Sequence, residues 1–327
     1  MKHLYRRALG AASLVPAVLA AVGLSAAAAQ ADEVTLRGTT AFAQGTTFSR
    51  PYEAFVDWIN EKGKGVLQIQ TVGGPEAMPP FEVGNAVSAG VVDVANVTAA
   101  FYTNILPMGD ALKLARNTIQ EQRANGCYDT IDALHRERIG VKYLARTGDH
   151  VNFHLYLTKP VEGPDLSGLT IRTTPVYQAM FEALDATLVT TPPGDVYTAL
   201  ERGTIDGYGW PIQGVLDLGW EEQTKYRVDP GFYQVDVNIL VNQERWDSLT
   251  DAQRALLEEG ARWIEARNAE NLEINAAEAK KQAAAGIEVI ALDGADRQRW
   301  LDTAQDAGWA KVEAIDAEAA AALRACL

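Results

Sequence analysis

The sequence has few of the residues from which catalytic and metal sites are usually built. Its 327 residues include only two cysteines, four histidines and six serines. No serine lies in a G-x-S-x-G or S-x-x-K motif, and the H-E-x-x-H, C-x-x-C and Walker-loop patterns are absent. These absences exclude the familiar signatures of serine hydrolases, zinc enzymes and P-loop enzymes. They do not exclude an acid–base pair, because such a pair leaves no sequence motif.

Positive charge is also scarce. The chain carries 29 lysines and arginines against 43 aspartates and glutamates, for a formal net charge of −14. This balance argues against binding to nucleic acids or to anionic membrane surfaces, which both favour basic patches. It is compatible with an anionic small molecule, because one buried arginine outweighs the distant surface charge at close range.

Long hydrophobic runs are absent except at the start of the chain. Three basic residues in the first seven are followed by an apolar stretch at 8–28 and by Ala-Gln-Ala at 29–31. This order predicts a signal peptide over residues 1–31, cleaved before Asp32, and therefore a periplasmic protein. A membrane anchor is the alternative, and the Arg6-Arg7 pair leaves both the general and the twin-arginine export routes open.

The cysteines and one histidine pair are the candidates for cross-links or metal ligands. Cys127 and Cys326 form either one disulfide, closing a loop of about 200 residues, or two separated buried thiols. His150 and His154 have a spacing that suits metal binding on a helix. Their segment has the pattern of a strand, in which this spacing places them roughly 13 Å apart. We therefore predict no bound metal and no cofactor.

Nine short runs rich in β-branched residues predict strands that alternate with amphipathic helices. The runs lie at 34–36, 66–72, 91–97, 141–144, 151–157, 169–173, 187–190, 235–241 and 287–292. This alternation predicts an α/β protein with largely parallel sheets.

One segment, from about 250 to 285, predicts a single long helix. It contains no proline and one glycine. Ser248 and Asp251 resemble a capping box at its start, and Gly286 ends it. Its length of about 50 Å exceeds one small lobe, so we expect it to brace two lobes. The predicted lobe I is 32–152 plus about 238–285, and lobe II is 153–237 plus about 286–327.

Residues 165–172, DLSGLTIR, resemble the D-L-x-G-x-x-[IV]-R signature of the DctP-type solute receptors of TRAP (tripartite ATP-independent periplasmic) transporters. The resemblance continues through FEALDA at 181–186, DVYTALERGTIDG at 195–207 and NQERWDSL at 242–249, and spans essentially the whole mature chain. It implies a clam-shaped periplasmic binding protein with two α/β lobes and a long bracing helix. It also implies a receptor, not an enzyme, that delivers a small organic anion to a small and a large membrane subunit. We expect a monomer.

Arg172 is the first candidate for a ligand contact. It ends a predicted strand, where α/β lobes present side chains to a cleft. The resemblance implies that this arginine pairs with the ligand carboxylate, and a guanidinium offers the two parallel N–H donors that a carboxylate matches. A structural salt bridge with one of the acidic residues is the alternative.

Trp210 is the second candidate. The resemblance implies that it replaces a ligand-contacting residue, often asparagine, of the family. Its flanking Gly209 and Pro211 predict a loop. A receptor branch for 2-oxo acids has Glu-Trp here and uses the glutamate in a metal site, whereas this chain has Gly209. Core packing is the alternative role for Trp210.

Eight further residues are candidates because they lie near predicted strand ends or, for Phe81 and Glu82, at the start of the helix expected after Pro79-Pro80: Thr40, Phe42, Phe81, Glu82, Thr98, Tyr102, Asn152 and Phe232. Their aromatic character favours a monocarboxylate with an aromatic or branched tail. A C4-dicarboxylate or sugar-acid receptor of the same family is the alternative. An ABC-type receptor, or a periplasmic enzyme using Glu82 and His154, is a more distant one.

Overall fold

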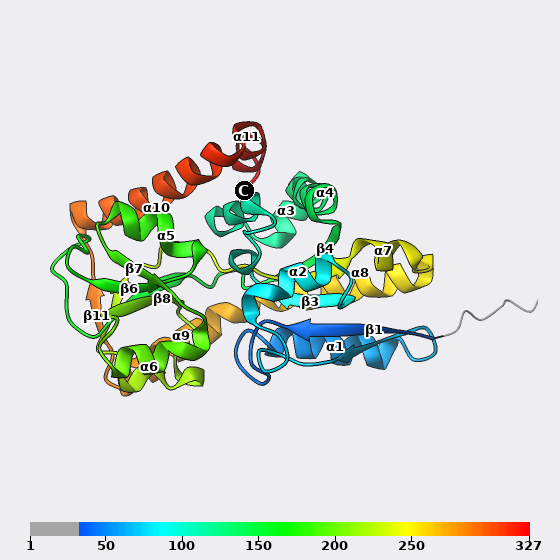
Figure 1. The fold of residues 1–327 in the computed structure, drawn as a ribbon, viewed down its shortest axis with the longest axis horizontal. Helices are drawn as coiled ribbons and strands as arrows, with labels where there is room; N and C mark the ends of the chain where they lie inside the picture. The colour runs from blue at the N-terminus through cyan, green and yellow to red at the C-terminus, as the bar shows by residue number, and fades with distance from the viewer. Residues whose placement is uncertain (1–32) are drawn as a thin grey trace, which may run out of the picture. The chain divides into compact units, whose positions relative to one another are not determined.

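The computed structural model describes residues 33–327, so the predicted signal peptide and its cleavage site lie outside the described residues. The described chain contains two β-sheets flanked by helices (Figure 1). The first sheet has the order β2-β1-β3-β10-β4. Its strands are β1 (Val34–Thr40), β2 (Leu67–Thr71), β3 (Val94–Val97), β4 (Val141–Thr147) and β10 (Val237–Asn242).

The second sheet has the order β11-β9-β5-β8-β6-β7. Its strands are β5 (Phe153–Leu157), β6 (Thr170–Thr173), β7 (Thr187–Thr190), β8 (Gly207–Pro211), β9 (Tyr226–Asp229) and β11 (Glu288–Ala291). The expected two-sheet α/β architecture is confirmed, and its sheets are largely parallel, with one antiparallel strand in each. Strands β10 and β5 run antiparallel to both of their neighbours. Each enters its sheet directly from the other sheet, without the covering helix that a parallel connection needs.

Eleven α-helices are assigned in residues 33–327. They are α1 (Arg50–Lys62), α2 (Val83–Ser88), α3 (Ile119–Asn125), α4 (Cys127–Ile139), α5 (Pro175–Ala183), α6 (Val196–Glu201), α7 (Gln243–Ser248), α8 (Asp251–Ala266), α9 (Asn271–Ala284), α10 (Gly294–Ile315) and α11 (Ala317–Arg324). None of the helices in this part of the chain is both long and apolar enough to cross a membrane.

Strands β8 and β9 were not predicted, and β8 corrects the expected loop around Trp210. Gly207 and Gly209 have a packing role in this strand. A Cβ atom at Gly207 would collide with the backbone oxygen of Tyr156, and one at Gly209 would lie 2.8 Å from the ring of Tyr177. The glycines therefore permit close packing in a buried strand, whereas Gly209 with Pro211 predicts a loop.

The predicted long helix is present as a continuous helical segment with one change of geometry. Helices α8 and α9 are joined by one turn of 3₁₀ helix, η7 (Arg267–Glu270). The capping box at its start is formed by Thr250 and Gln253, which corrects the predicted Ser248–Asp251 pair. Helix α8 packs against β4 of the first sheet, and Gln282 of α9 donates to the backbone of Ile212, next to the second sheet. The segment therefore contacts both sheets.

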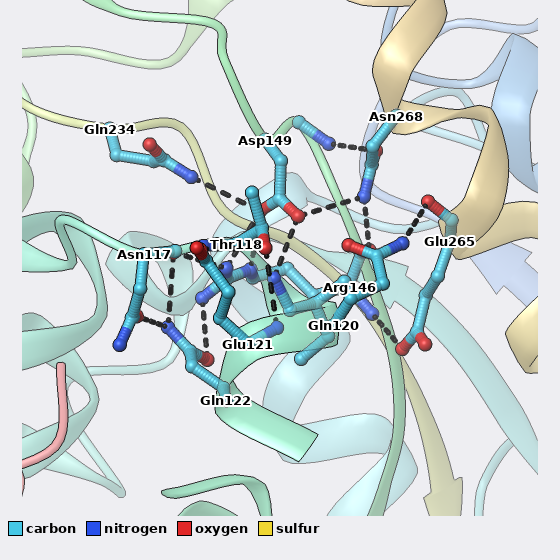
Figure 2. A network of polar contacts seen from close by, with 12 residues as sticks. Asn117, Thr118, Gln120, Glu121, Gln122, Arg146, Asp149, Gln234, Glu265 and Asn268 are labelled. Atoms are coloured by element: carbon cyan, nitrogen blue, oxygen red, sulfur yellow. Dashed lines mark hydrogen bonds and ion pairs between the residues drawn. The ribbon is translucent and has the colours of Figure 1, made fainter. Parts of the chain in front are cut away.

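Three segments connect the two sheets: residues 148–152, residues 230–236 and η7. All three meet at Asp149, which is fully buried (Figure 2). Its Oδ1 accepts from Arg146 at 2.6 Å and from Gln234 at 3.1 Å, while its Oδ2 accepts from the Ile119 amide at 2.8 Å and from Asn268 at 3.2 Å. One carboxylate thus links these three connecting segments.

The C-terminal helices form another connection. Helix α10 packs against α5 and against the 3₁₀ helix η3 (Pro107–Leu114), and α11 packs against α4 (Figure 1). Cys326, just after α11, forms a disulfide with Cys127 at the start of α4, with their Cα atoms 5.3 Å apart. The chain that leaves the second sheet after β11 is therefore covalently joined to a helix beside the first sheet.

Candidate functional site

A small cavity lies between the two sheets and has a volume of about 30 Å³. The first sheet and its connections contribute Phe42, Phe48, Thr98, Ala100, Phe101, Val235, Asp236 and Val237. The second sheet and its connections contribute Phe153, Arg172, Thr174, Val176, Tyr177, Trp210 and Pro211. The lining is mainly aromatic and aliphatic, with a few polar groups, which is typical of a small-molecule site.

Arg172, on β6, is the cation of this cavity, and it is fully buried. Its Nε donates to the Thr191 carbonyl at 2.9 Å and its Nη1 to the Gly209 carbonyl at 3.4 Å. Its Nη2 has no hydrogen-bond partner among the described residues, and no carboxylate pairs with the group there. Burial lowers the pKa of the guanidinium to about 10. An uncompensated buried cation is costly, so the site favours an anion.

Two more polar atoms of the lining also lack partners. The indole Nε1 of Trp210 and the hydroxyl of Thr98 are buried and make no hydrogen bond within residues 33–327. The Trp210 ring lies 5.9 Å from the guanidinium carbon of Arg172 and packs edge-on against Phe48 at 6.0 Å. Unsatisfied buried polar atoms are uncommon in native proteins, and three of them around one cavity indicate a binding site.

Asp236 lines the same cavity from the segment that leads into β10 and is also buried. Its Oδ2 accepts from the Ala99 amide and from Asn238 Nδ2, both at 2.9 Å. Burial raises the pKa of this carboxyl to about 6, although both hydrogen bonds oppose the shift. The cavity therefore contains an acidic group as well as a cation.

Of the ten sequence-predicted contacts, the structure brings four together around the cavity: Phe42, Thr98, Arg172 and Trp210. The other six do not line it: Thr40, Phe81, Glu82, Tyr102, Asn152 and Phe232.

Three of these six lie next to residues that line the cavity. The Thr40 hydroxyl accepts from the Phe42 amide at 3.2 Å, and so fixes the loop that carries that ring. Phe81 packs edge-on against Phe101, with ring centroids 4.8 Å apart. The hydroxyl of Tyr102 accepts from Asn238 Nδ2 at 3.1 Å, and the same nitrogen donates to Asp236 of the lining.

The remaining three lie elsewhere. Glu82 is exposed and accepts from Asn85 at 2.8 Å, and Asn152 is exposed beside the connecting segments. Phe232 packs against Trp300, with ring centroids 5.5 Å apart, in the core of the second sheet's helices. Placement near a strand end therefore did not suffice to predict contact with the cavity.

Sequence reasoning missed several lining residues, of which Phe48, Tyr177 and Asp236 are the most informative. Tyr177 belongs to the motif region and follows Arg172 by five residues, so the family resemblance could have suggested it. Phe48 and Asp236 lie in irregular segments, where no periodicity predicts the direction of a side chain.

The cavity is closed on one edge by contacts between the sheets. Asp217, in the 3₁₀ helix η5 (Leu216–Leu218), accepts from the amide and the hydroxyl of Thr47, both at 2.7 Å. A second cavity of about 130 Å³ lies beneath this contact and shares Phe42, Phe48 and Trp210 with the first. The two cavities therefore adjoin at this edge.

The described residues 33–327 contain no group of three or more histidines, cysteines, aspartates or glutamates placed to hold a metal ion. His154, on β5, lies 2.9 Å from Asp229 and 3.1 Å from the Val228 carbonyl, which both engage its Nδ1. Glu82 and His154, which sequence analysis considered as an enzyme's acid–base pair, thus make separate contacts. The cavity therefore combines one buried guanidinium with a mainly apolar lining.

Comparison with known proteins identifies the family. A family model described as bacterial extracellular solute-binding protein, family 7 (DctP), matches residues 38–314. The 2,3-diketo-L-gulonate-binding periplasmic protein of Escherichia coli is 27% identical over 217 residues, which cover 62% of this chain and 64% of that relative. A monocarboxylate 2-oxoacid-binding periplasmic protein of a Nostoc species is 25% identical over 207 residues, which cover 58% and 55%. The chain thus spans less than two thirds of the length of these curated relatives.

Solved structures agree with the fold. The crystal structure of a TRAP periplasmic solute-binding protein from Desulfovibrio salexigens, with bound orotic acid, has a TM-score of 0.77 at 19% sequence identity. The alignment covers 88% of this chain and 96% of that chain. The family match over 38–314 confirms the resemblance drawn from the motif at 165–172. The chain belongs to the DctP family, the bacterial extracellular solute-binding proteins of family 7, which are solute receptors and not enzymes.

Proposed function

We propose that this chain is a periplasmic receptor of a TRAP transporter and that it binds a small organic acid in the cavity around Arg172. The observation that carries the proposal is the unpaired state of this guanidinium. It is fully buried and its Nη2 has no partner among residues 33–327. A ligand carboxylate would supply the missing charge and accept the free N–H donors in a site of low dielectric constant.

The preferred solute in this proposal is a monocarboxylate with an aromatic or branched tail. Phe42, Phe48, Phe101 and Phe153 surround the cavity with flat apolar faces. Such faces gain binding free energy from an apolar ligand body. The cavity lining contains one cation, Arg172, whereas a dicarboxylate would favour two. Relatives named for monocarboxylate 2-oxo acids and for orotic acid are consistent with this solute class.

The proposal extends to location and partners. The predicted signal peptide at 1–31 would export the chain to the periplasm, and the receptor would pass its solute as a monomer to the small and large membrane subunits of the transporter. Opening and closing would occur between the two predicted lobes. The proteins with similar structures that are named as TRAP periplasmic solute-binding proteins support this assignment.

A thermal-shift screen of the mature protein against organic acids tests the proposal. Saturating ligand stabilises a receptor by RT ln(1 + [L]/Kd), about 2.7 kcal/mol at a hundredfold excess over Kd. We expect aryl and branched-chain 2-oxo or 2-hydroxy acids to raise Tm in the wild type and to have no effect on Arg172→Met. Arg254→Met is the control, because it removes a partly exposed arginine on α8.

Each result has a distinct meaning. Wild-type affinity in Arg172→Met would contradict the carboxylate site. Stabilisation by dicarboxylates or sugar acids alone would keep the receptor role but contradict the aromatic solute class. No stabilisation by any organic acid would contradict the proposed function.

A further inference from the structure

Asp236 lines the cavity that contains the proposed carboxylate site. It belongs to the segment that leads into β10 of the first sheet, whereas Arg172 belongs to β6 of the second. Both line the same small cavity. Both also act on Tyr177, since the positive charge of Arg172 lowers the pKa of its hydroxyl and the negative charge of Asp236 raises it, although burial dominates. A ligand bound in this cavity would therefore lie near both groups.

Only part of the hydrogen-bonding capacity of Asp236 is used by the fold. Its two hydrogen bonds, from the Ala99 amide and Asn238, both end on Oδ2. Its Oδ1 has no hydrogen-bond partner among residues 33–327, and the side chain pairs with no cation there. Asp149 provides the contrast, because both of its oxygens accept two hydrogen bonds or more and Arg146 neutralises it.

We propose that Asp236 is a specificity-determining residue that selects acids bearing an O–H or N–H donor on the carbon next to the carboxylate. This inference rests on the proposed function and names its solute class more closely: 2-hydroxy or 2-amino acids with an apolar tail. A ligand with such a donor satisfies Oδ1 while its carboxylate meets Arg172. A ligand without the donor leaves Oδ1 of Asp236 buried without a hydrogen-bond partner. Such a ligand therefore binds more weakly.

A matched ligand series tests the inference. Isothermal titration calorimetry compares 3-phenylpropionate, phenyllactate, phenylalanine and phenylpyruvate, which differ only at the second carbon. We expect phenyllactate or phenylalanine to bind at least about tenfold more tightly than 3-phenylpropionate. Their order distinguishes a hydroxyl donor from an ammonium donor. Malonate and hydroxymalonate make the same comparison for dicarboxylates, so the donor preference is measured even when the aromatic class is wrong.

The variant Asp236→Asn connects any preference to this side chain. It has nearly the same size and keeps an oxygen that can accept from the Ala99 amide, while it removes the charge. We expect the preference for the donor-bearing acid to fall to within about threefold, with the affinity for 3-phenylpropionate unchanged or higher. Glu82→Gln, at an exposed acidic residue outside the cavity, serves as the control and should keep the wild-type ratio.

The outcomes separate the two proposals. Equal affinities across each matched set in the wild type would overturn the role of Asp236, and this comparison needs no variant to fold. An unchanged ratio in folded Asp236→Asn would overturn it as well. In both cases binding that depends on Arg172 would still support the receptor function. Loss of all binding, in both the aromatic and the malonate sets, would overturn the proposed solutes and this inference together.

Discussion

Two arginines, Arg146 and Arg172, are completely buried, yet their surroundings differ. Arg146 forms an ion pair with Asp149 at 2.6 Å and donates to Gln122 at 2.9 Å in the network that joins the connecting segments (Figure 2). Arg172 reaches only backbone carbonyls. Burial lowers the pKa of both groups, but for Arg146 the combined effect of Asp149, Tyr143 and Asp236 exceeds that of burial, so its pKa is raised.

The difference between the two arginines distinguishes a structural role from a role in ligand recognition. A buried charge whose partners are all supplied by the fold stabilises one arrangement of the chain. A buried charge with an unused donor lacks a partner within the fold. Keeping it unpaired lowers the stability of the ligand-free protein. The same contrast holds between the acids Asp149 and Asp236. Four variants test how far this comparison extends.

The largest effect is expected for Arg146→Met. This change leaves Asp149 buried without its cation, and breaking a buried pair in this way costs roughly 3–5 kcal/mol. Urea unfolding followed by circular dichroism measures the free energy of unfolding. A loss below about 1 kcal/mol would mean that the network is not structural and would remove the basis of the comparison.

The next effect concerns pH and Asp236. Because burial raises the pKa of this carboxyl to about 6, the folded chain binds the proton more tightly than the unfolded chain does. Stability attributable to Asp236 therefore rises as the pH falls from 7 toward 4, by about 2–3 kcal/mol, since one pKa unit corresponds to about 1.4 kcal/mol. The measurement is the free energy of unfolding of the ligand-free wild type relative to Asp236→Asn.

The variant comparison in that experiment is needed because His135 acts in the opposite direction. Burial lowers the pKa of His135 to about 4, so its contribution to stability is lost as the pH falls through the same range. Both proteins contain His135, and its effect cancels in the difference. A difference that does not change between pH 7 and 4 would contradict the buried, unpaired state of Asp236.

A smaller effect is expected for Trp210→Phe. A smaller aromatic ring remains beside Phe48 and Trp220, while the unpartnered Nε1 donor is removed. We expect affinity for the bound acid to fall about threefold to tenfold. The unfolding free energy of the ligand-free protein should fall by about 1–2 kcal/mol, because buried atoms of the indole are lost. Calorimetry and thermal melts measure the two quantities. Unchanged affinity would assign Trp210 to packing alone.

The smallest effect on stability is expected for Arg172→Met in the absence of ligand. Replacing a buried, unpaired cation by an apolar chain of similar length removes its desolvation cost. We expect the free energy of unfolding to stay within about 1 kcal/mol of the wild type or to increase. A loss as large as that of Arg146→Met would show that the two arginines do not differ in role.

The sequence was sufficient to predict much of this molecule but not the details of its cavity. Periodicity predicted nine of the strands, and the motif at 165–172 pointed to Arg172. The glycines of β8 suggested a loop because their packing role depends on Tyr156 and Tyr177, which lie far from them along the chain. Asp236 carries no motif, and its environment exists only once β3, β10 and their connections are in place.

The connections on the two edges of the cavity differ in kind. One contains the disulfide between Cys127 and Cys326, and the other consists of hydrogen bonds. On one edge α10 and α11 pass from the second sheet to α4, and the covalent bond fixes their far end. On the other edge Asp217 holds Thr47 through hydrogen bonds. A separation of the sheets that keeps the covalent bond would leave α11 joined to α4, while the hydrogen bonds between Thr47 and Asp217 would break. The proposed solute would then reach Arg172 past Thr47 and Asp217, through the adjoining cavity of about 130 Å³.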